Sequence, residues 1–259
     1  MSAAEPGDRL PSSIGGLLGF AFAAFAERAP LYVLLALGAF IAAGITEYAL
    51  PMAAEATPHG LFRGIVLTLV QIFADALVIA AVALGVAARV AGEPVATRTV
   101  AGAAIERWLP VIGVTAMAQL FVLQTVLFSG LTRPPEPRAL VVATAPLTWL
   151  LWGMLSLTGP IVALTRDRLA VITGFARAFT LSLRRENLLR LGVLSLISLV
   201  PSVLQALALP VLVQHHALRP DFWANIPIDA LTVGPLAALQ TAFALDFARR
   251  AGELQTPPQ

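Results

Sequence analysis

Several uninterrupted apolar runs of about 20 residues dominate this sequence. Read as an α-helix, a run of that length matches the hydrocarbon thickness of a bilayer, and soluble cores do not need repeated runs of this kind. The sequence therefore predicts an all-α polytopic membrane helix bundle that forms a single integral membrane domain over residues 1–259. Six transmembrane helices are expected, at residues 30–51, 61–88, 108–130, 139–164, 188–213 and 228–248.

Composition agrees with this class of protein. Hydrophobic residues make up 58% of the chain and charged residues 12%, with a mean hydropathy of +0.83. A soluble domain carries about 25% charged residues. Cysteine is absent, which excludes a disulfide framework and thiolate metal sites. The pI near 9.9 would suggest a nucleic-acid partner for a soluble protein, but membrane topology explains the basic excess without nucleic acid.

The arginines are divided unequally between the two sides that six spans define. Thirteen of the 17 accompany the termini and the connections on one side, and four fall on the other: Arg63, Arg133, Arg138 and Arg219. Because basic loops stay in the cytoplasm, both termini are expected there. The first residues lack the basic stretch, apolar core and cleavage site of a secretory signal, so the N-terminus is expected to remain on the mature protein.

A basic stretch at residues 165–190 lies between two apolar segments. Read as one helix, it places Thr173, Arg177, Thr180 and Arg184 on one face, and Ile172, Phe175, Phe179 and Leu183 on another. This pattern is typical of a helix at the membrane interface, with its basic side on the lipid headgroups. The residues expected to contact headgroups are Arg98, Arg177, Arg184, Arg185 and Arg190.

Two further short helices are expected on the same side, at residues 13–28 and from Pro94 through Arg107. Each of the three basic or amphipathic segments contains a β-branched residue, any residue and then glycine, and each has an acid–arginine pair before the next span. The pattern suggests three units of interfacial helix plus transmembrane hairpin. Chance similarity in a sequence rich in alanine and leucine is the alternative.

Asp75 is the sharpest candidate for function, because it lies near the middle of the span at 61–88. Thr68, Gln71 and Asp75 share a helical face and are expected to point into the bundle. A carboxyl group there costs about 3 kcal/mol to insert and is a candidate proton or cation site. A neutral, hydrogen-bonded structural aspartate is the alternative. Glu47, near the outer end of the first span, is predicted to pair with Arg63.

Other polar patterns are less specific. Ser195, Ser198, Ser202 and Gln205 follow one face of the fifth span, and Thr115 and Gln119 share a face of the third; such stripes join helices more often than they line pores. Pro201 and Gly234-Pro235 predict kinks. His215 and His216 lack the spacing of a metal pair. No metal site, cofactor or catalytic residue is predicted, and the sequence lacks the G-x-S-x-G, H-E-x-x-H and P-loop motifs.

Three segments resemble a family of six-span bacterial inner-membrane proteins, the YciC-like family, which includes membrane domains attached to some glycerophosphodiester phosphodiesterases. They are IGGLLGFAFAAFAERAPLYVLLAL, ARVAGEPVATRTVAGAAIERWLPVIG and GPIVALTRDRLAVITGFARAFTLSLRRENLLRLGVL, together with the closing TAFALDFARR. In the third, RENLLRLGVL is similar to the family's RxNxxRLxxL pattern. The resemblance implies a helical inner-membrane protein with cytoplasmic termini, and it implies no catalytic residues.

Two functions are therefore expected from different classes. The first is a non-enzymatic envelope protein that contacts lipids, anionic ones in particular, or scaffolds partners such as a second copy of the chain or another envelope protein. The alternative is a transporter of a small solute or lipid that uses Asp75. A water-accessible cavity reaching Asp75 would favour transport, and a dry, tightly packed bundle would favour the scaffold.

Overall fold

The computed structural model describes residues 10–50, 58–93, 96–131, 149–165, 169–215 and 220–253. Some helical residues are described by their backbone alone, at positions 47, 58–61, 64, 119–131, 202, 206 and 220–226. Within the described residues there is no strand, and five helices are long and apolar enough to cross a membrane. The predicted all-α membrane bundle is confirmed.

Each of the long helices covers one predicted span. They are α2 (Ala29–Ala49), α3 (Pro58–Ala91), α4 (Thr97–Leu131), the pair α8 (Leu188–Ser198) and α9 (Val200–Gln214), and α10 (Pro220–Arg250). Helices α4 and α10 begin earlier in the chain than predicted. The predicted span at residues 139–164 lies partly outside the described residues. Its described part is a helical stretch at residues 149–156 that continues into the short helix α6 (Thr158–Leu164).

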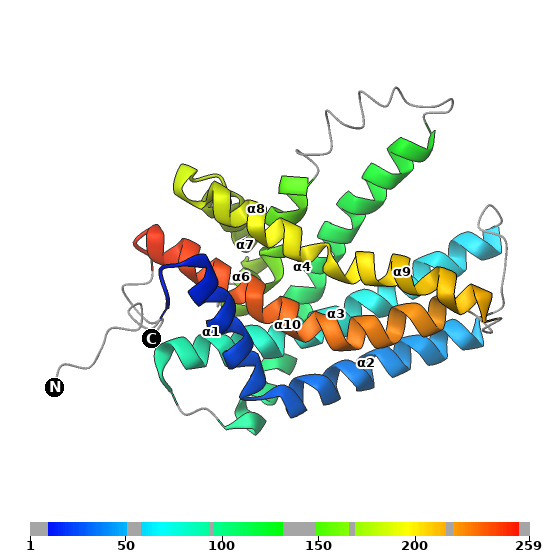
Figure 1. Ribbon diagram of the computed structural model, residues 1–259, viewed down its shortest axis with the longest axis horizontal. Coiled ribbons are helices and arrows are strands. Elements are labelled where there is room, and N and C mark those ends of the chain that lie inside the picture. Colours follow the sequence, from blue (N-terminus) through cyan, green and yellow to red (C-terminus); the bar gives the residue numbers. More distant parts are fainter. Residues whose placement is uncertain are drawn as a thin grey trace.

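Helix α10 is the centre of the bundle. It packs against α2, α3 and α9, which run beside it along the long axis of the molecule (Figure 1). Of its membrane-spanning stretch, 61% of the residues are buried, the largest share among the spanning helices described. Its inner face carries Ala237, Ala238 and Ala242, and such small side chains let neighbouring backbones approach closely in membranes.

Helix α1 (Ile14–Ala26) matches the short helix predicted at residues 13–28. Ser13 caps it, because the Ser13 hydroxyl oxygen accepts a hydrogen bond from the Gly16 backbone N–H at 3.1 Å. Leu17, Ala21 and Ala24 are fully buried where α1 packs against α3 and α10. The helix is therefore part of the bundle's own packing.

The two helices α3 and α10 end in the same way, at the sequences ARVAGE and ARRAGE. Gly92 and Gly252 have φ of 73° and 76°, the left-handed conformation that glycine adopts without strain. The following N–H of Glu93 bonds back to Ala88 O, and that of Glu253 to Ala248 O. This is the Schellman ending of a helix. The predicted first and third repeat units thus share a 13-residue first helix and the same type of helix ending.

The second predicted repeat unit is different, and here one prediction was wrong. We expected a separate short helix from Pro94 through Arg107 and a new span from residue 108, but α4 continues through this point. Trp108 Nε1 donates to Phe73 O at 2.9 Å, and Arg107 donates to Thr165 O at 3.0 Å. Arg107 and Trp108, where the sequence suggested a boundary, therefore lie within α4 and contact other parts of the bundle.

The basic stretch at residues 165–190 is also not one helix. Helix α7 (Ala170–Ser182) ends before Arg184, whose backbone is extended, and a 3-10 turn (Arg185–Asn187) leads into α8. The turn is closed by the buried Asn187, whose Nδ2 donates to Leu181 O at 2.8 Å. The predicted face containing Arg177 and Arg184 is therefore interrupted.

The buried face of α7 also differs from the predicted apolar face. It consists of Ala170, Gly174, Ala178 and Leu181, because α7 packs closely on α6. A Cβ on Gly174 would lie 2.4 Å from the Val162 side chain, so only glycine fits this crossing. Of the predicted apolar face, Ile172 and Leu183 are exposed, and Phe175 and Phe179 stack on each other.

The helix is interrupted close to Pro201, where a kink was predicted. The helix breaks at Leu199, and Pro201 lies in the first turn of α9, where the missing proline N–H disrupts no helical bond. In contrast, α10 remains a single helix through Pro227 and Pro235.

Candidate functional site

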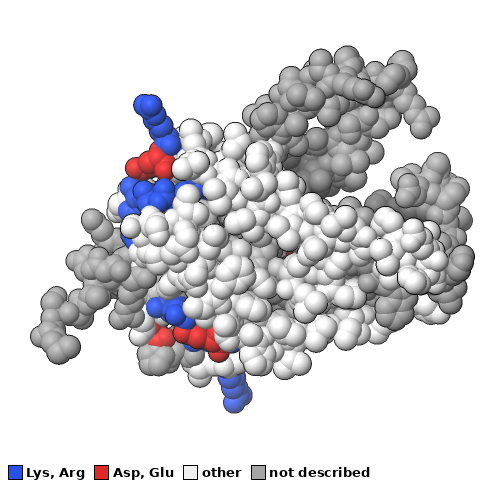
Figure 2. Space-filling view, viewed as in Figure 1, with Lys and Arg blue, Asp and Glu red and all other residues white. Residues whose placement is uncertain are grey.

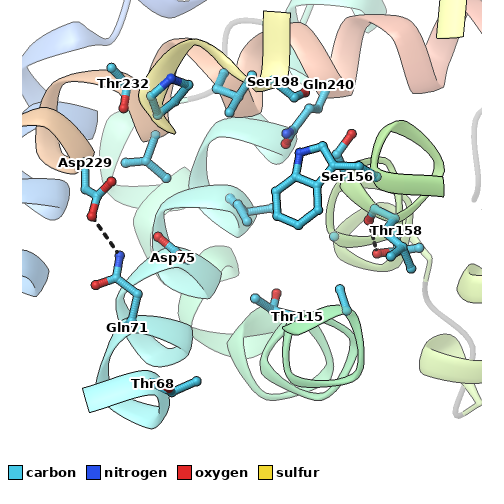
Figure 3. A pocket seen from close by; sticks show the side chains of 18 of the residues that line it. Thr68, Gln71, Asp75, Thr115, Ser156, Thr158, Ser198, Asp229, Thr232 and Gln240 are labelled. Atoms are coloured by element: carbon cyan, nitrogen blue, oxygen red, sulfur yellow. Dashed lines mark hydrogen bonds between the residues drawn. The ribbon is translucent and has the colours of Figure 1, made fainter. Parts of the chain in front are cut away.

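A half-open cavity of about 530 Å³ lies among the helices of the bundle (Figure 3), and Ser198 and Pro201, on either side of the break between α8 and α9, line part of it. Helices α2, α3, α4, α6, α8, α9 and α10 all contribute to its wall, together with residues 149–156. Asp75 and Asp229 are the only ionisable side chains among the described residues that line it. The structure thus has a polar interior that carries acidic groups and no described basic one.

Helix α3 supplies the face that the sequence predicted. Thr68, Gln71 and Asp75 all line the cavity, followed by Ile79 one turn further on. Spacings of three and four residues place these side chains on one side of the helix. At 1.5 Å per residue, Asp75 lies about 20 Å along α3 from Arg89 at the helix end.

Asp229 is the residue that the sequence analysis missed. It lies near the start of the α10 span and on the same side of the cavity as Asp75, with Gln71 between them (Figure 3). Its Oδ2 accepts a hydrogen bond from Gln71 Nε2 at 3.2 Å, and its Oδ1 accepts one from Gln205 Nε2 at 2.8 Å. Side chains from α3 and α9 therefore orient a carboxyl group of α10. An acidic residue within an apolar span was the available signal.

The polar stripe of the fifth span divides into two roles. Ser198 and Gln205 line the cavity, whereas Ser195 belongs to a helix crossing, where its hydroxyl donates to Leu191 O at 2.8 Å and packs on Gly153. The Ser202 side chain lies outside the described residues. In the third span, Thr115 lines the cavity and the Gln119 side chain is outside the described residues.

The charged side chains gather at one end of the molecule (Figure 2). Of the arginines predicted to contact headgroups, Arg98, Arg184 and Arg185 are exposed. Arg177 forms an ion pair with Glu253, with 2.7 Å between Arg177 Nη2 and Glu253 Oε2. Arg190 is mostly buried and faces Asp246 inside the protein, an arrangement that the sequence analysis did not foresee.

Asp246 organises this charged end. Its side chain is fully buried, and it forms ion pairs with Arg190, Arg249 and Arg250. The same guanidinium groups donate to the backbone carbonyls of residues 10–12, including Arg190 Nη2 to Ser12 O at 2.6 Å. The cluster thus fastens the N-terminal segment and α8 to the end of α10. The i+3 and i+4 spacing of the last two arginines from Asp246 was its local signal.

The remaining predicted polar residues do not join these sites. Glu47 belongs to α2, but its side chain is outside the described residues, so its pairing with Arg63 stays a prediction. His215 ends α9 at the surface, and His216 lies outside the described residues. Among the described residues, no group of three or more histidine and acidic side chains is arranged to hold a metal ion.

No protein family, curated protein or solved structure matches this chain in sequence or fold comparisons. The resemblance to the YciC-like family therefore stays a prediction.

Proposed function

We propose that this integral membrane protein binds a small polar solute or ion within the membrane and transports it, without catalysing a reaction. The observation that carries the proposal is the cavity with Asp75 and Asp229 in its wall. Ligand sites occupy about 300–1,000 Å³, and this cavity falls in that range. A carboxyl group inside a membrane costs about 3 kcal/mol to insert, which favours a functional reason for its presence.

The break between α8 and α9 supports transport in particular. Ser198 ends α8 and Pro201 begins α9, and both line the cavity. Transporters commonly build their sites from discontinuous helices, because a broken helix offers backbone polar groups and a place to bend. A movement of α9 relative to α8 would change access to the two carboxyl groups.

Proton flux tests the proposal. Purified protein in liposomes containing the pH dye pyranine is exposed to a pH gradient, and flux above that of protein-free liposomes is expected. Asp75→Asn should abolish it, while Glu93→Gln should not, because Glu93 is exposed beyond the end of α3. Thermal unfolding shows whether each variant is folded. No flux in the wild type, or equal flux in folded Asp75→Asn, would reject proton transport through Asp75.

A second candidate function is contact with anionic lipids. Arg184 and Arg185 are exposed between α7 and α8, and within the described part of the chain neither forms an ion pair. Exposed arginines at a membrane surface attract anionic headgroups by about 1 kcal/mol each. Lipid contact of this kind, or scaffolding of a second copy or another envelope protein, is compatible with transport.

Native mass spectrometry from lipid nanodiscs tests this second function. The double variant Arg184→Glu with Arg185→Glu should lose bound anionic lipid while staying folded. Arg177→Glu is a poorer test, because it also breaks the ion pair with Glu253. Unchanged lipid retention in the double variant would refute the lipid role.

The orientation follows the same charge pattern. The charged end contains the described start of the chain, at residue 10, and the end of α10 (Figures 1 and 2). We propose that this end faces the cytoplasm of a bacterium, with the bundle in its inner membrane. Single cysteines introduced at Ser12 and Glu253 test this orientation when intact cells are treated with a membrane-impermeant thiol reagent. Labelling of either cysteine would show that this end faces outward and contradict the proposal.

A further inference from the structure

Three hydroxyl groups in the cavity wall are oriented as hydrogen-bond acceptors. The Ser156 hydroxyl donates to Gly153 O at 2.8 Å, and the Thr232 hydroxyl donates to Ile228 O at 2.7 Å. The Thr158 hydroxyl likewise donates to Leu155 O. A hydroxyl group has one proton, so each of these oxygens can only accept from a ligand. Together with the two carboxyl groups, the wall therefore suits a ligand that donates hydrogen bonds.

The two amide groups also present acceptors. Gln71 and Gln205 each use one Nε2 proton to donate to Asp229, so each amide keeps its carbonyl oxygen as an acceptor and one further N–H as a donor. Because two amide groups hold Asp229, its carboxyl group keeps a fixed place on the same side of the cavity as Asp75, which is one helical turn from Gln71.

A buried serine provides an independent indication of a ligand. Ser198 is 5% exposed and lines the cavity, and its hydroxyl has no hydrogen-bond partner among the described residues (Figure 3). Trp152 Nε1, in the same wall, also lacks a described partner. Buried polar groups in proteins are bonded in the large majority of cases. Two unpartnered groups in one cavity wall are therefore consistent with a polar occupant.

Size separates an organic ligand from a bare metal ion. A bare metal ion is held by about six oxygen ligands at about 2.0–2.6 Å. A cavity of about 530 Å³ is larger than such a coordination shell needs. The wall also has an apolar part, formed by residues such as Leu67, Ile79 and Leu236, against which a short carbon chain can pack. Trp152 is the one aromatic side chain among the described lining residues, and quaternary ammonium sites use several aromatic rings.

We propose that the cavity binds a small primary ammonium compound, with the –NH₃⁺ group on the side of the wall that carries Asp75 and Asp229 and the carbon chain on the apolar part of the wall. This inference deepens the proposed transport function and rests on it. The ammonium group brings three donors and one positive charge to a wall that carries two acidic groups and several acceptor oxygens. Because charges interact more strongly in a low-dielectric site than in water, the two acidic groups should give a cation a higher affinity than a neutral compound of equal size.

Matched probes test the inference on the wild-type protein in nanodiscs by isothermal titration calorimetry. The set is 4-aminobutan-1-ol, butane-1,4-diol and 4-hydroxybutanoate, which differ only in the group at one end. At about pH 7 a primary amine is protonated. The ammonium compound is expected to bind at least about tenfold more tightly than the diol, and the carboxylate should bind most weakly. The N,N,N-trimethyl derivative, which has no N–H donor, should also lose affinity.

Variants locate the binding in the cavity. Asp229→Asn keeps the shape of the side chain and should remove most of the preference for the ammonium compound over the diol. Glu93→Gln removes an acidic group outside the cavity and should leave the preference unchanged. Thr232→Val removes one acceptor and no charge, so it should reduce the affinity for the ammonium compound by a smaller factor than Asp229→Asn does. It replaces Asp229→Asn as the test of the cavity if that variant does not fold.

The outcomes distinguish this inference from transport itself. Equal binding of the diol and the ammonium compound, no binding of any probe, an undiminished preference in folded Asp229→Asn, or an undiminished affinity in Thr232→Val would overturn the ammonium assignment. Proton flux that depends on Asp75 would still support transport in each of these cases. Conversely, tight ammonium binding without flux would keep the site and reject the transport function.

Discussion

Arg190, near the start of α8, and Asp246, in the last turns of α10, are joined by an ion pair of 3.1 Å between Nε and Oδ2. The Asp246 side chain has no solvent exposure, whereas the arginine is 14% exposed. Arg249 and Arg250 bind the same carboxylate. One buried acid therefore holds three guanidinium groups at the charged end of the bundle.

Asp246→Asn should destabilise the protein strongly. The substitution leaves the three arginines close together without their shared counter-charge, and removal of one partner from a buried ion pair costs about 3–5 kcal/mol. The free energy of unfolding, measured by SDS titration in mixed micelles, should fall by about 3 kcal/mol. Glu253→Gln breaks the half-exposed pair with Arg177 and should cost less than about 1 kcal/mol. Equal losses would argue against a special role for Asp246.

Gly85→Ala should destabilise the contact between α2 and α3. A Cβ at this position would lie 1.8 Å from the hydroxyl oxygen of Tyr32, whose side chain is fully buried. Overpacking of this kind costs about 1–3 kcal/mol. Gly38→Ala is the control, because a Cβ there meets nothing within 4 Å. Alanine favours a helix over glycine, so the control should be neutral or slightly stabilising in thermal unfolding.

Asn187→Ala should weaken the turn between α7 and α8. The side chain is buried, and it donates to the Leu181 carbonyl, which would otherwise be an unpaired group near the end of α7. An unsatisfied buried acceptor costs about 1–3 kcal/mol. Glu186→Ala, at an exposed neighbouring position, should have little effect on the unfolding midpoint. If the two variants unfold alike, the hydrogen bond contributes nothing.

Pro201→Ala should slow transport without loss of stability. Proline lacks the N–H for a helical bond and clashes with the preceding turn, so alanine would allow α8 and α9 to join more continuously. Proton flux in liposomes should fall by at least about threefold if the break assists opening of the cavity. Pro210→Ala is the matched control, since Pro210 is exposed in α9 and does not line the cavity. Faster or unchanged flux in Pro201→Ala would exclude the break as a hinge.

The sequence was most informative where structure depends on neighbours in the chain. The short helix at residues 13–28, the break near Pro201 and the cavity-facing side of α3 at Gln71 and Asp75 all follow from residues within a few turns. It was misleading at Arg107 and Arg184. At Arg107, which donates to the distant Thr165 carbonyl, the helix continues, and at Arg184 a turn closed by the nearby Asn187 ends it.

By itself, the sequence determined that the chain forms apolar helices of membrane-spanning length, because hydrophobicity and helical period are properties of contiguous residues. Only the tertiary structure brought Asp229 beside Gln71 and Gln205, and Arg190 onto Asp246. These residues lie on different helices, and the rotation and crossing of each helix are set by close packing of small side chains such as Gly153 against Ser195. A local pattern marks a polar residue in a span, but packing decides which other polar residue it meets.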